Sequence, residues 1–221
     1  MNLDGLYYTL VRVFQTYRNM ENVEIELRFG WKTSKMFDTN IGKRYFDIVS
    51  KILKSISNTT TKTYQDEIHI HKNRRYIVGN TTNVQMKTRV ETIDFELEGT
   101  PFDVRISVCQ EIPKSLLEHP LPNNSVWLRK RNRTSIQYKM WNYELTEVNI
   151  QKPRNDDEDT CTLYEFEIEF DTNFDPSHSN SYLAHSLYLK ILDVLQFENT
   201  IDQKAEKCNL KNIVIVNQTK A

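Results

Sequence analysis

Much of the chain alternates polar with apolar residues, which is the pattern of β-strands whose two faces meet different surroundings. The stretch EFEIEF at 165–170 is the most regular example. Because successive side chains of a strand point to opposite faces, three glutamates form one row, and Phe166, Ile168 and Phe170 form the other. The acidic row consists of Glu165, Glu167 and Glu169.

A second segment near the start of the chain, NVEIELRFG at 22–30, also carries its charges on one face. Its charged row consists of Glu24, Glu26 and Arg28. Either segment alone fits an ordinary antiparallel strand with one face in water. Two acidic rows that face each other across a sheet or barrel would repel unless a cation lies between them, and a divalent metal ion is the natural candidate.

The same periodicities predict the other elements of the fold. We expect helices over residues 3–18, about 40–56 and the segment SYLAHSLYLKILDVLQF, each with an apolar face at helical spacing. Strands are expected near 23–30, 62–70, 73–79, 84–95, 102–111, 126–138, 140–150 and 162–171, with a last short strand at 212–216. No internal repeat beyond the two acidic strands and no linker is visible, so we expect one domain over residues 1–221.

Most of the predicted strands have one charged face. Their charged or polar rows are Lys87, Arg89 and Glu91; Asp103, Arg105, Ser107, Cys109 and Glu111; Arg129, Arg131 and Arg133; and Asn142, Glu144 and Thr146. The three amphipathic helices need an apolar surface to cover, and the apolar strand faces supply it. The charged faces would then turn inward, which predicts a barrel with a polar tunnel inside and helices outside. A flat sheet with its charges in water remains the alternative from the pattern alone.

Composition sets the general class of the protein. The 221 residues, 38% of them hydrophobic, suffice for one substantial domain. A formal net charge of -1 hides 29 basic and 30 acidic residues, so any nucleic-acid affinity must come from a local cluster. Three widely spaced cysteines argue against a disulfide framework and fit a reducing compartment. Without a basic leader or a long apolar run, we expect an intracellular protein, neither secreted nor bound to a membrane.

Several kinds of chemistry have no support in the sequence. There is no recognisable Ser-His-Asp or Cys-His constellation and no GxxxxGK[ST] phosphate loop, which argues against covalent catalysis and P-loop chemistry. His69 and His71 alternate on one predicted strand without a third ligand at a convincing spacing, so we interpret them as ordinary polar residues.

The ordered series EIELRFG, RKRNRTS, ELTEV and YEFEIEF resembles the metal-dependent RNA 5′-triphosphatases of fungi and large DNA viruses, the triphosphate tunnel metalloenzymes. The resemblance extends over about residues 20 to 195. It implies an α+β fold with an eight-stranded antiparallel β-barrel, whose tunnel holds the 5′-triphosphate end of nascent RNA and a Mg²⁺ or Mn²⁺ ion. It also implies the reaction, which is release of the γ-phosphate in the first step of mRNA capping.

Position by position, the resemblance implies a metal site formed by Glu24, Glu26 and Glu169. Glu111 matches a glutamate that orients the attacking water, and Arg105 matches a basic tunnel position on the same strand face. Arg131 and Arg133 match a basic pair that contacts phosphate oxygens. We therefore expect these last four side chains to be catalytic.

A further set of tunnel residues is expected to bind or brace the substrate: Arg28, Arg75, Lys87, Arg89, Arg129, Glu165 and Glu167. The two glutamates of this set match residues that support metal-bound waters or orient basic side chains. Arg28 stands where the family has lysine, Asn142 where some members have arginine, and Glu147 where some have lysine. Glu144 and Thr146 match an acid-x-Thr element that braces the arginines.

These residue types suit phosphoryl transfer, which needs charge neutralisation on the phosphate oxygens and an aligned attacking water. Hard carboxylate oxygens suit Mg²⁺ or Mn²⁺, and arginine binds phosphate oxygens with two parallel hydrogen bonds.

Two other functions stay open at this stage. One is a tunnel phosphohydrolase for inorganic triphosphate, thiamine triphosphate or free nucleotides, and the other is a non-catalytic module that binds triphosphates or RNA ends. The sequence has no guanylyltransferase lysine motif. By resemblance, we expect a guanylyltransferase partner in cis, with this domain as the N-terminal part of a larger capping enzyme, or in trans. The expected location is the cytoplasm, the nucleus, or a viral factory or virion.

Overall fold

The computed structural model describes residues 3–123, 127–151, 161–174 and 177–196. Its three helices are α1 (Leu3–Tyr17), α2 (Lys43–Lys54) and α3 (Asn180–Gln196). Its strands are β1 (Val23–Lys32), β2 (Phe37–Asp38), β3 (Thr60–His71), β4 (Arg74–Val78), β5 (Thr82–Phe95), β6 (Asp103–Lys114), β7 (Trp127–Tyr138), β8 (Trp141–Gln151) and β9 (Cys161–Phe170).

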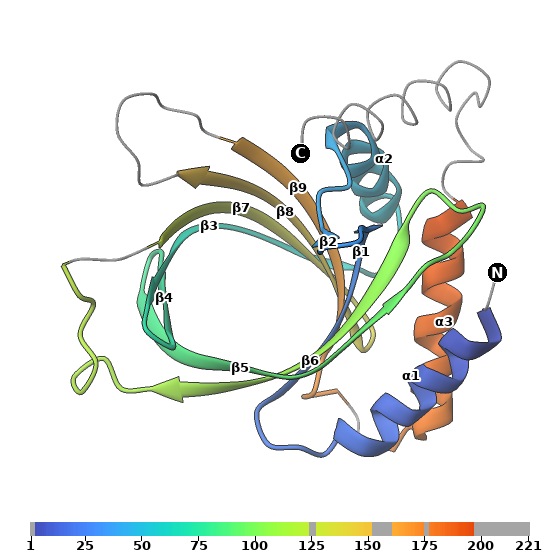
Figure 1. Ribbon diagram of the computed structural model, residues 1–221, viewed down its shortest axis with the longest axis horizontal. Helices are drawn as coiled ribbons and strands as arrows, with labels where there is room; N and C mark the ends of the chain where they lie inside the picture. The colour runs from blue at the N-terminus through green and yellow to red at the C-terminus, as the bar shows by residue number, and fades with distance from the viewer. Residues whose placement is uncertain (1–2, 124–126, 152–160, 175–176, 197–221) are drawn as a thin grey trace.

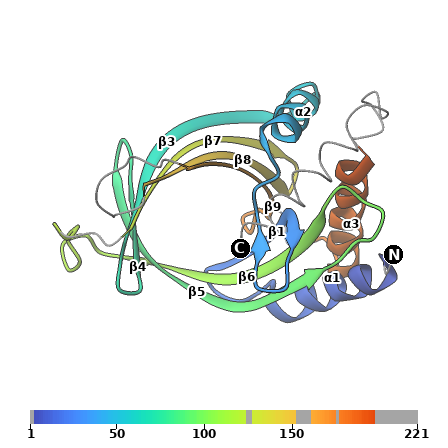
Figure 2. The same cartoon turned by 45° about the horizontal axis from the view of Figure 1, so that its top comes forward.

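Eight of these strands close into an antiparallel barrel (Figures 1 and 2). The strand order around the ring is β1-β6-β5-β4-β3-β7-β8-β9, and β9 pairs back with β1. The closing contact is short and joins Glu26 with Glu169, Leu27 with Ile168, and Arg28 with Glu167. All eight barrel strands and all three helices expected from the periodicity are therefore confirmed, whereas the expected strand at 212–216 lies outside the described residues.

The hydrophobic core lies outside the barrel, between its wall and the helices. Apolar side chains of the closing strands, such as Leu27 and Ile168, are fully buried there. α1 and α3 lie side by side against this wall (Figure 1), and Phe14 of α1 contacts the Phe170 ring with 5.4 Å between ring centroids. Burial of this outer apolar surface is the main stabilising contribution, and it leaves the inner face to the charged side chains.

α2 covers the same side of the barrel near β9. Its Tyr45 ring packs against Phe102 with 4.4 Å between centroids, and Phe46 packs against Tyr164 at 5.3 Å. None of the described helices has the length and apolarity that a membrane span requires.

The short strand β2 was not predicted. It folds back on the end of β1, pairing Trp31 with Asp38 and Lys32 with Phe37. The close approach requires Gly30, because a Cβ at this position would lie 2.0 Å from the Asp38 carbonyl oxygen. The segment then continues beside β9, where the Ile41 amide donates to the Tyr164 carbonyl at 2.9 Å.

One predicted row is broken by a β-bulge in β5. The register between β5 and β6 shifts between Arg89 and Glu91, so the extra residue Val90 reverses the alternation. Lys87 and Arg89 lie on the inner face as expected, but Glu91 turns outward and forms an ion pair with Arg12 of α1, 2.8 Å from Nη2 to Oε1. The expectation that Glu91 shares their face is therefore wrong.

Candidate active site

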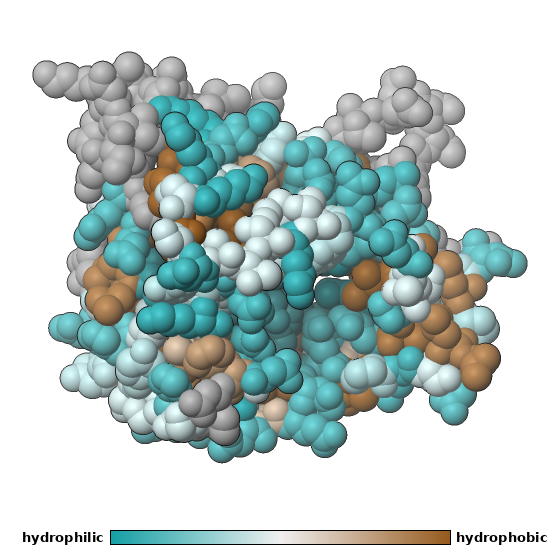
Figure 3. Space-filling model, turned by 180° about the vertical axis from the view of Figure 1, so that it is seen from behind, coloured by the Kyte–Doolittle hydropathy of each residue, from teal (hydrophilic) through white to brown (hydrophobic). Residues whose placement is uncertain are grey.

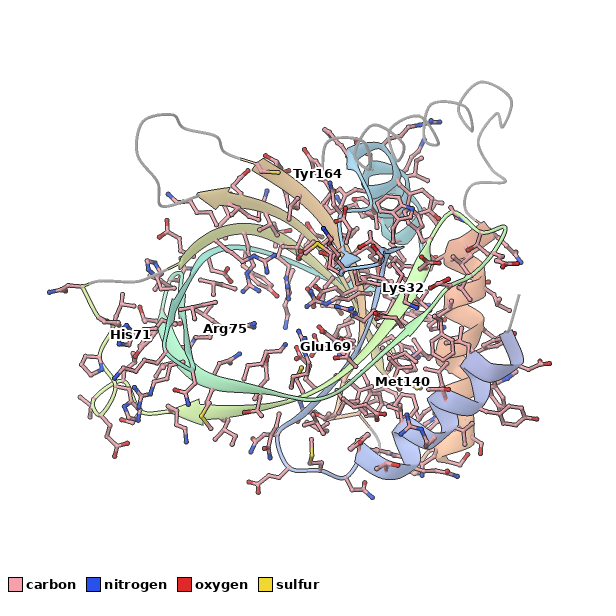
Figure 4. The ribbon with its side chains drawn as sticks, viewed as in Figure 1. Lys32, His71, Arg75, Met140, Tyr164 and Glu169 are labelled. Atoms are coloured by element: carbon pink, nitrogen blue, oxygen red, sulfur yellow. The ribbon has the colours of Figure 1, made fainter. Side chains whose placement is uncertain are left out.

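The three predicted metal-binding glutamates lie together where the barrel closes. Glu26 on β1 is directly opposite Glu169 on β9, and Glu24 is two residues away on the same face of β1. Figure 4 shows Glu169 and Arg75 projecting into the barrel from different parts of its wall. Seen from behind, the molecule has a hollow whose visible walls are mostly hydrophilic (Figure 3).

The carboxylates of this cluster repel one another in a buried setting. Burial, together with the nearby charges of Glu24 and Glu144, raises the pKa of Glu169 well above its ordinary value. Burial and repulsion by Glu26 raise the pKa of Glu24 to about 7, against the opposing pull of Lys87. The negative charge of the cluster is therefore only partly neutralised by the basic side chains around it.

Two basic side chains partly neutralise the cluster. Arg28 contacts Glu26 with both Nε and Nη2, at 3.0 and 3.1 Å, and its Nη2 lies 3.0 Å from Glu167 Oε1. The Lys87 ammonium contacts Glu24 and also Glu111, at 2.9 Å from Oε1. Glu169 forms no salt bridge within the described part of the chain.

The donor set fits a hard divalent cation. Carboxylate oxygens are the ligands that Mg²⁺ and Mn²⁺ prefer, and Glu169 offers a half-buried carboxylate without a cationic partner among the described side chains. In this conformation no three His, Cys, Asp or Glu side chains of the described ranges form a ready coordination shell. The reason is visible in the contacts, since Glu26 and Glu24 are turned toward Arg28 and Lys87.

Three arginines of β7 form a basic wall that extends the site: Arg129, Arg131 and Arg133. Arg131 binds Asp66 through two parallel hydrogen bonds of 2.7 Å, from Nε and Nη2. Arg129 Nη2 lies 2.9 and 3.0 Å from the two Glu165 oxygens, and the same carboxylate accepts a hydrogen bond from Thr39 Oγ1 at 2.9 Å. Such paired contacts fix the planes of the guanidinium groups.

Arg133, the third arginine of the wall, lies closest to the carboxylate cluster. Its Nε donates to Thr146 Oγ1 at 2.8 Å and lies 3.7 Å from Glu144 Oε2, and its Nη2 lies 3.8 Å from Glu167 Oε2. Burial alone would raise the pKa of Glu167, but Arg28 and Arg133 outweigh burial and lower that pKa to about 2. Glu167 is therefore ionised at neutral pH and braces the two arginines, and Thr146 braces Arg133 as expected.

Glu111 lies on β6 within a second polar group. Its carboxylate accepts a hydrogen bond from Gln85 Nε2 at 2.9 Å, contacts Lys87, and lies 3.7 Å from Arg75 Nη1. Burial opposes ionisation here, but Lys87 and Arg75 lower the pKa of Glu111 below its ordinary value. Lys87 thus joins Glu111 to Glu24.

Two predicted residues share the inner face without joining the cluster. Arg105 lies opposite Arg28, but its guanidinium binds Asp94 with bonds of 2.6 and 2.9 Å and stacks on the Phe37 ring at 4.7 Å. Arg89 lies opposite Cys109 and is exposed, with no salt bridge among the described residues.

Three bracing residues were missed by the sequence reasoning. Asp66 lies in the predicted strand 62–70 with the right alternation, so its inward direction was readable, but its pairing with Arg131 was not. Asp94 had no such signal because the bulge at Val90 reverses its face. Thr39 lies in a loop that returns to the barrel wall, and no periodicity in the sequence predicts this return.

The closed barrel with carboxylates at its seam and braced basic side chains around its interior defines the class of triphosphate tunnel phosphohydrolases. The chain belongs to the mRNA capping enzyme, beta chain family, whose sequence profile matches residues 26–181. It is thus an RNA 5′-triphosphatase, which removes the γ-phosphate from 5′-triphosphate RNA in the first step of mRNA capping.

Solved structures share the fold. The S. pombe Pct1 RNA triphosphatase superposes with a TM-score of 0.69 at 16% identity, covering 89% of this chain and 92% of that chain. The same protein in complex with the Spt5 CTD gives 0.67, with the same identity and coverage. The Mimivirus capping enzyme triphosphatase gives 0.56 at 14% identity, covering 87% of this chain and 98% of that one. No curated protein sequence matches the chain.

Proposed function

We propose that the triphosphatase reaction of this chain depends on a divalent cation, Mg²⁺ or Mn²⁺, held by Glu24, Glu26 and Glu169. The observation that carries the proposal is the placement of Glu26 directly opposite Glu169, with the pKa of Glu169 raised well above its ordinary value. When bound there, the cation supplies charge neutralisation at the γ-phosphate. Binding of the cation also relieves the repulsion between the carboxylates.

The basic wall binds the triphosphate in this account. Arg131 and Arg133 are held by acceptors on one side of their guanidinium groups, by Asp66 and by Thr146. Their other N–H groups can donate to phosphate oxygens, as arginine forks do. Arg28, Arg75 and the further basic positions Lys87, Arg89, Arg105 and Arg129 supply additional positive charge along the same inner face.

Glu111 orients the attacking water in this proposal. Its lowered pKa keeps the carboxylate ionised at neutral pH, so it can accept a hydrogen bond from water. Lys87 connects it to Glu24 on the adjacent strand β1, and in this proposal the water and the γ-phosphate therefore lie in one region of the tunnel. Glu165 and Glu167 act indirectly, because they orient Arg129 and Arg133.

The direct test is phosphate release from γ-labelled 5′-triphosphate RNA with Mg²⁺, Mn²⁺ or EDTA. We expect metal-dependent release that Glu26→Ala and Glu169→Ala reduce by at least about a hundredfold, since a hard-cation site loses a ligand. Glu91→Ala is the matched control, because this glutamate lies on the outer face. Equal release with EDTA, or equal release by folded Glu169→Ala, would refute the metal-dependent mechanism.

The same assay separates the alternative functions. Faster turnover of inorganic triphosphate, thiamine triphosphate or free nucleotides than of RNA would favour a small-molecule phosphohydrolase. Tight binding of triphosphate RNA without release under either metal would favour a non-catalytic module.

We also propose that the domain acts beside a guanylyltransferase, in cis as the N-terminal part of a larger capping enzyme or in trans. It would act wherever RNA is capped, in the nucleus, the cytoplasm or a viral factory.

A further inference from the structure

The inner face of β3 continues the site away from the carboxylate cluster. Asp66 on this face binds Arg131, and the preceding inward positions are Tyr64 and Lys62. Tyr64 lies opposite Arg133 and Lys62 lies opposite Ser135, whose hydroxyl donates to Glu144 inside the barrel at 2.8 Å. Opposed residues of an antiparallel pair share a face, so both side chains border the tunnel.

Tyr64 is an aromatic side chain open to the tunnel. Most large aromatic residues of the barrel point outward into the core, as Phe29 and Phe166 do with rings stacked 5.2 Å apart. Phe37 faces inward but is 6% exposed and covers Arg105. Tyr64 is 40% exposed, and it lies opposite Arg133 of β7. A ring face is therefore available to a ligand next to a phosphate-binding arginine.

Lys62 adds a positive charge on the same row. It is exposed and forms no ion pair among the described residues. Because side chains two positions apart on a strand are separated by about 7 Å, its ammonium and the Tyr64 ring reach neighbouring parts of one extended ligand. An aromatic ring beside a cation is the combination that proteins use to hold single-stranded nucleic acid.

We propose that Tyr64 and Lys62 form a nucleotide subsite that holds the RNA chain behind the triphosphate. The base of the first nucleotide stacks on the Tyr64 ring, and Lys62 binds the phosphodiester that follows it. This inference rests on the proposed function, since the triphosphate must lie along Arg131 and Arg133. It gives the tunnel a preference for RNA ends over inorganic triphosphate, because the latter has no base and no phosphodiester.

Tyr64 could instead act only through its hydroxyl by orienting Arg133, and two substitutions separate these roles. Tyr64→Phe keeps the ring and removes the hydroxyl, whereas Tyr64→Leu removes the stacking surface. We expect Tyr64→Leu to raise KM for triphosphate RNA about tenfold, within the range measured for base–aromatic stacking, and to leave KM for inorganic triphosphate unchanged. Tyr64→Phe should stay within about twofold of wild type on both substrates.

Lys62→Ala tests the second half of the subsite. It should raise KM for an oligonucleotide but not for a free nucleoside triphosphate, which has no following phosphodiester. The slope of log KM against log salt for the oligonucleotide should fall by about 0.7, the value for one phosphate contact on a single strand. Tyr8→Leu and Lys51→Ala are the controls, since both residues are exposed on the outer helices.

Anisotropy measurements with diphosphate-ended RNA give the same comparison without turnover. Weaker binding by Tyr64→Leu, with unchanged binding of pyrophosphate as competitor, supports the subsite. If Tyr64→Leu weakens the interaction with RNA and with inorganic triphosphate equally, or weakens neither, the subsite proposal is overturned. If wild-type protein binds RNA through Tyr64 but releases no phosphate, the proposed function fails and the subsite stands. If release is intact and the variants match wild type, the subsite alone fails.

Discussion

Glu26 and Glu169 lie directly opposite each other where β1 and β9 close the barrel. Two carboxylates on one face of an antiparallel pair destabilise the pairing when both are ionised. The barrel nevertheless closes here, through only three residue pairs. The closing contact is therefore the place where a bound cation would contribute most to both stability and catalysis.

This relationship predicts that the metal-free protein loses stability as the pH rises from about 5 to about 8. Glu24 has a pKa of about 7 in the folded protein against 4.5 in its ordinary state, and the pKa of Glu169 is also raised. At a pH between the ordinary pKa of 4.5 and the folded-state pKa of about 7, Glu24 keeps its proton in the folded chain but has lost it in the unfolded chain. Stability is thus complete at low pH and falls as the pH rises, for Glu24 by on the order of 3 kcal/mol.

Thermal denaturation in EDTA measures this effect, with Glu24→Gln as the comparison. The substitution imitates the protonated side chain, so the fall in Tm with pH should be smaller than in the wild type. Added Mn²⁺ should restore wild-type Tm at the alkaline end, because ligands that bind only the folded state stabilise it. A wild-type Tm that rises through neutral pH in EDTA contradicts the assignment. The lowered pKa of Glu167 acts in the opposite direction, because stability is lost as the pH falls. This loss occurs only below about pH 4.5.

Asp66 is predicted to be as important as the arginine that it holds. Asp66→Asn leaves the Arg131 guanidinium, whose side chain is 10% exposed, without its charged partner. We expect a loss of about 3 kcal/mol in the free energy of unfolding, as for a broken buried pair, and a fall in kcat/KM of at least about tenfold. Asp47→Asn breaks the exposed pair with Lys43, which water screens, and should lower the free energy of unfolding far less. Equal effects of the two substitutions in urea denaturation would contradict this account.

Gly30 is predicted to be intolerant of a side chain. In Gly30→Ala the new methyl group would meet the Asp38 carbonyl oxygen at 2.0 Å, so β2 has to move. The movement displaces Thr39 from Glu165 and Phe37 from Arg105. We expect a decrease in Tm of at least about 5 °C, measured by differential scanning calorimetry. A variant with wild-type Tm and a wild-type rate of phosphate release would show that β2 has no such role.

Periodicity was enough to predict the barrel strands and the inward direction of most charges. The alternation of EFEIEF and of NVEIELRFG fixed which side chains share a face, and the structure places Glu26 and Glu169 together accordingly. The family resemblance rested on the same residues. These features are readable because they depend on local geometry, which has a period of two in every strand.

Features of the fold that depend on strand register could not be predicted from the sequence. One extra residue at Val90 reverses the face of everything that follows it in β5, which sends Glu91 to α1 and Asp94 to Arg105. The pairing of Asp66 with Arg131 joins strands far apart in sequence. No pattern in either strand specifies such a partner, because register is set by turns, bulges and packing.

Mn²⁺ binding, measured by electron paramagnetic resonance on the wild type, Glu26→Gln and Glu169→Gln, tests the central claim most directly. Both substitutions keep the size of the side chain and remove one negative oxygen, so the fold should be retained. The account predicts Mn²⁺ binding by the wild type that each substitution weakens at least about tenfold, the effect of losing a ligand. Mn²⁺ binding of equal strength in all three folded proteins would contradict it.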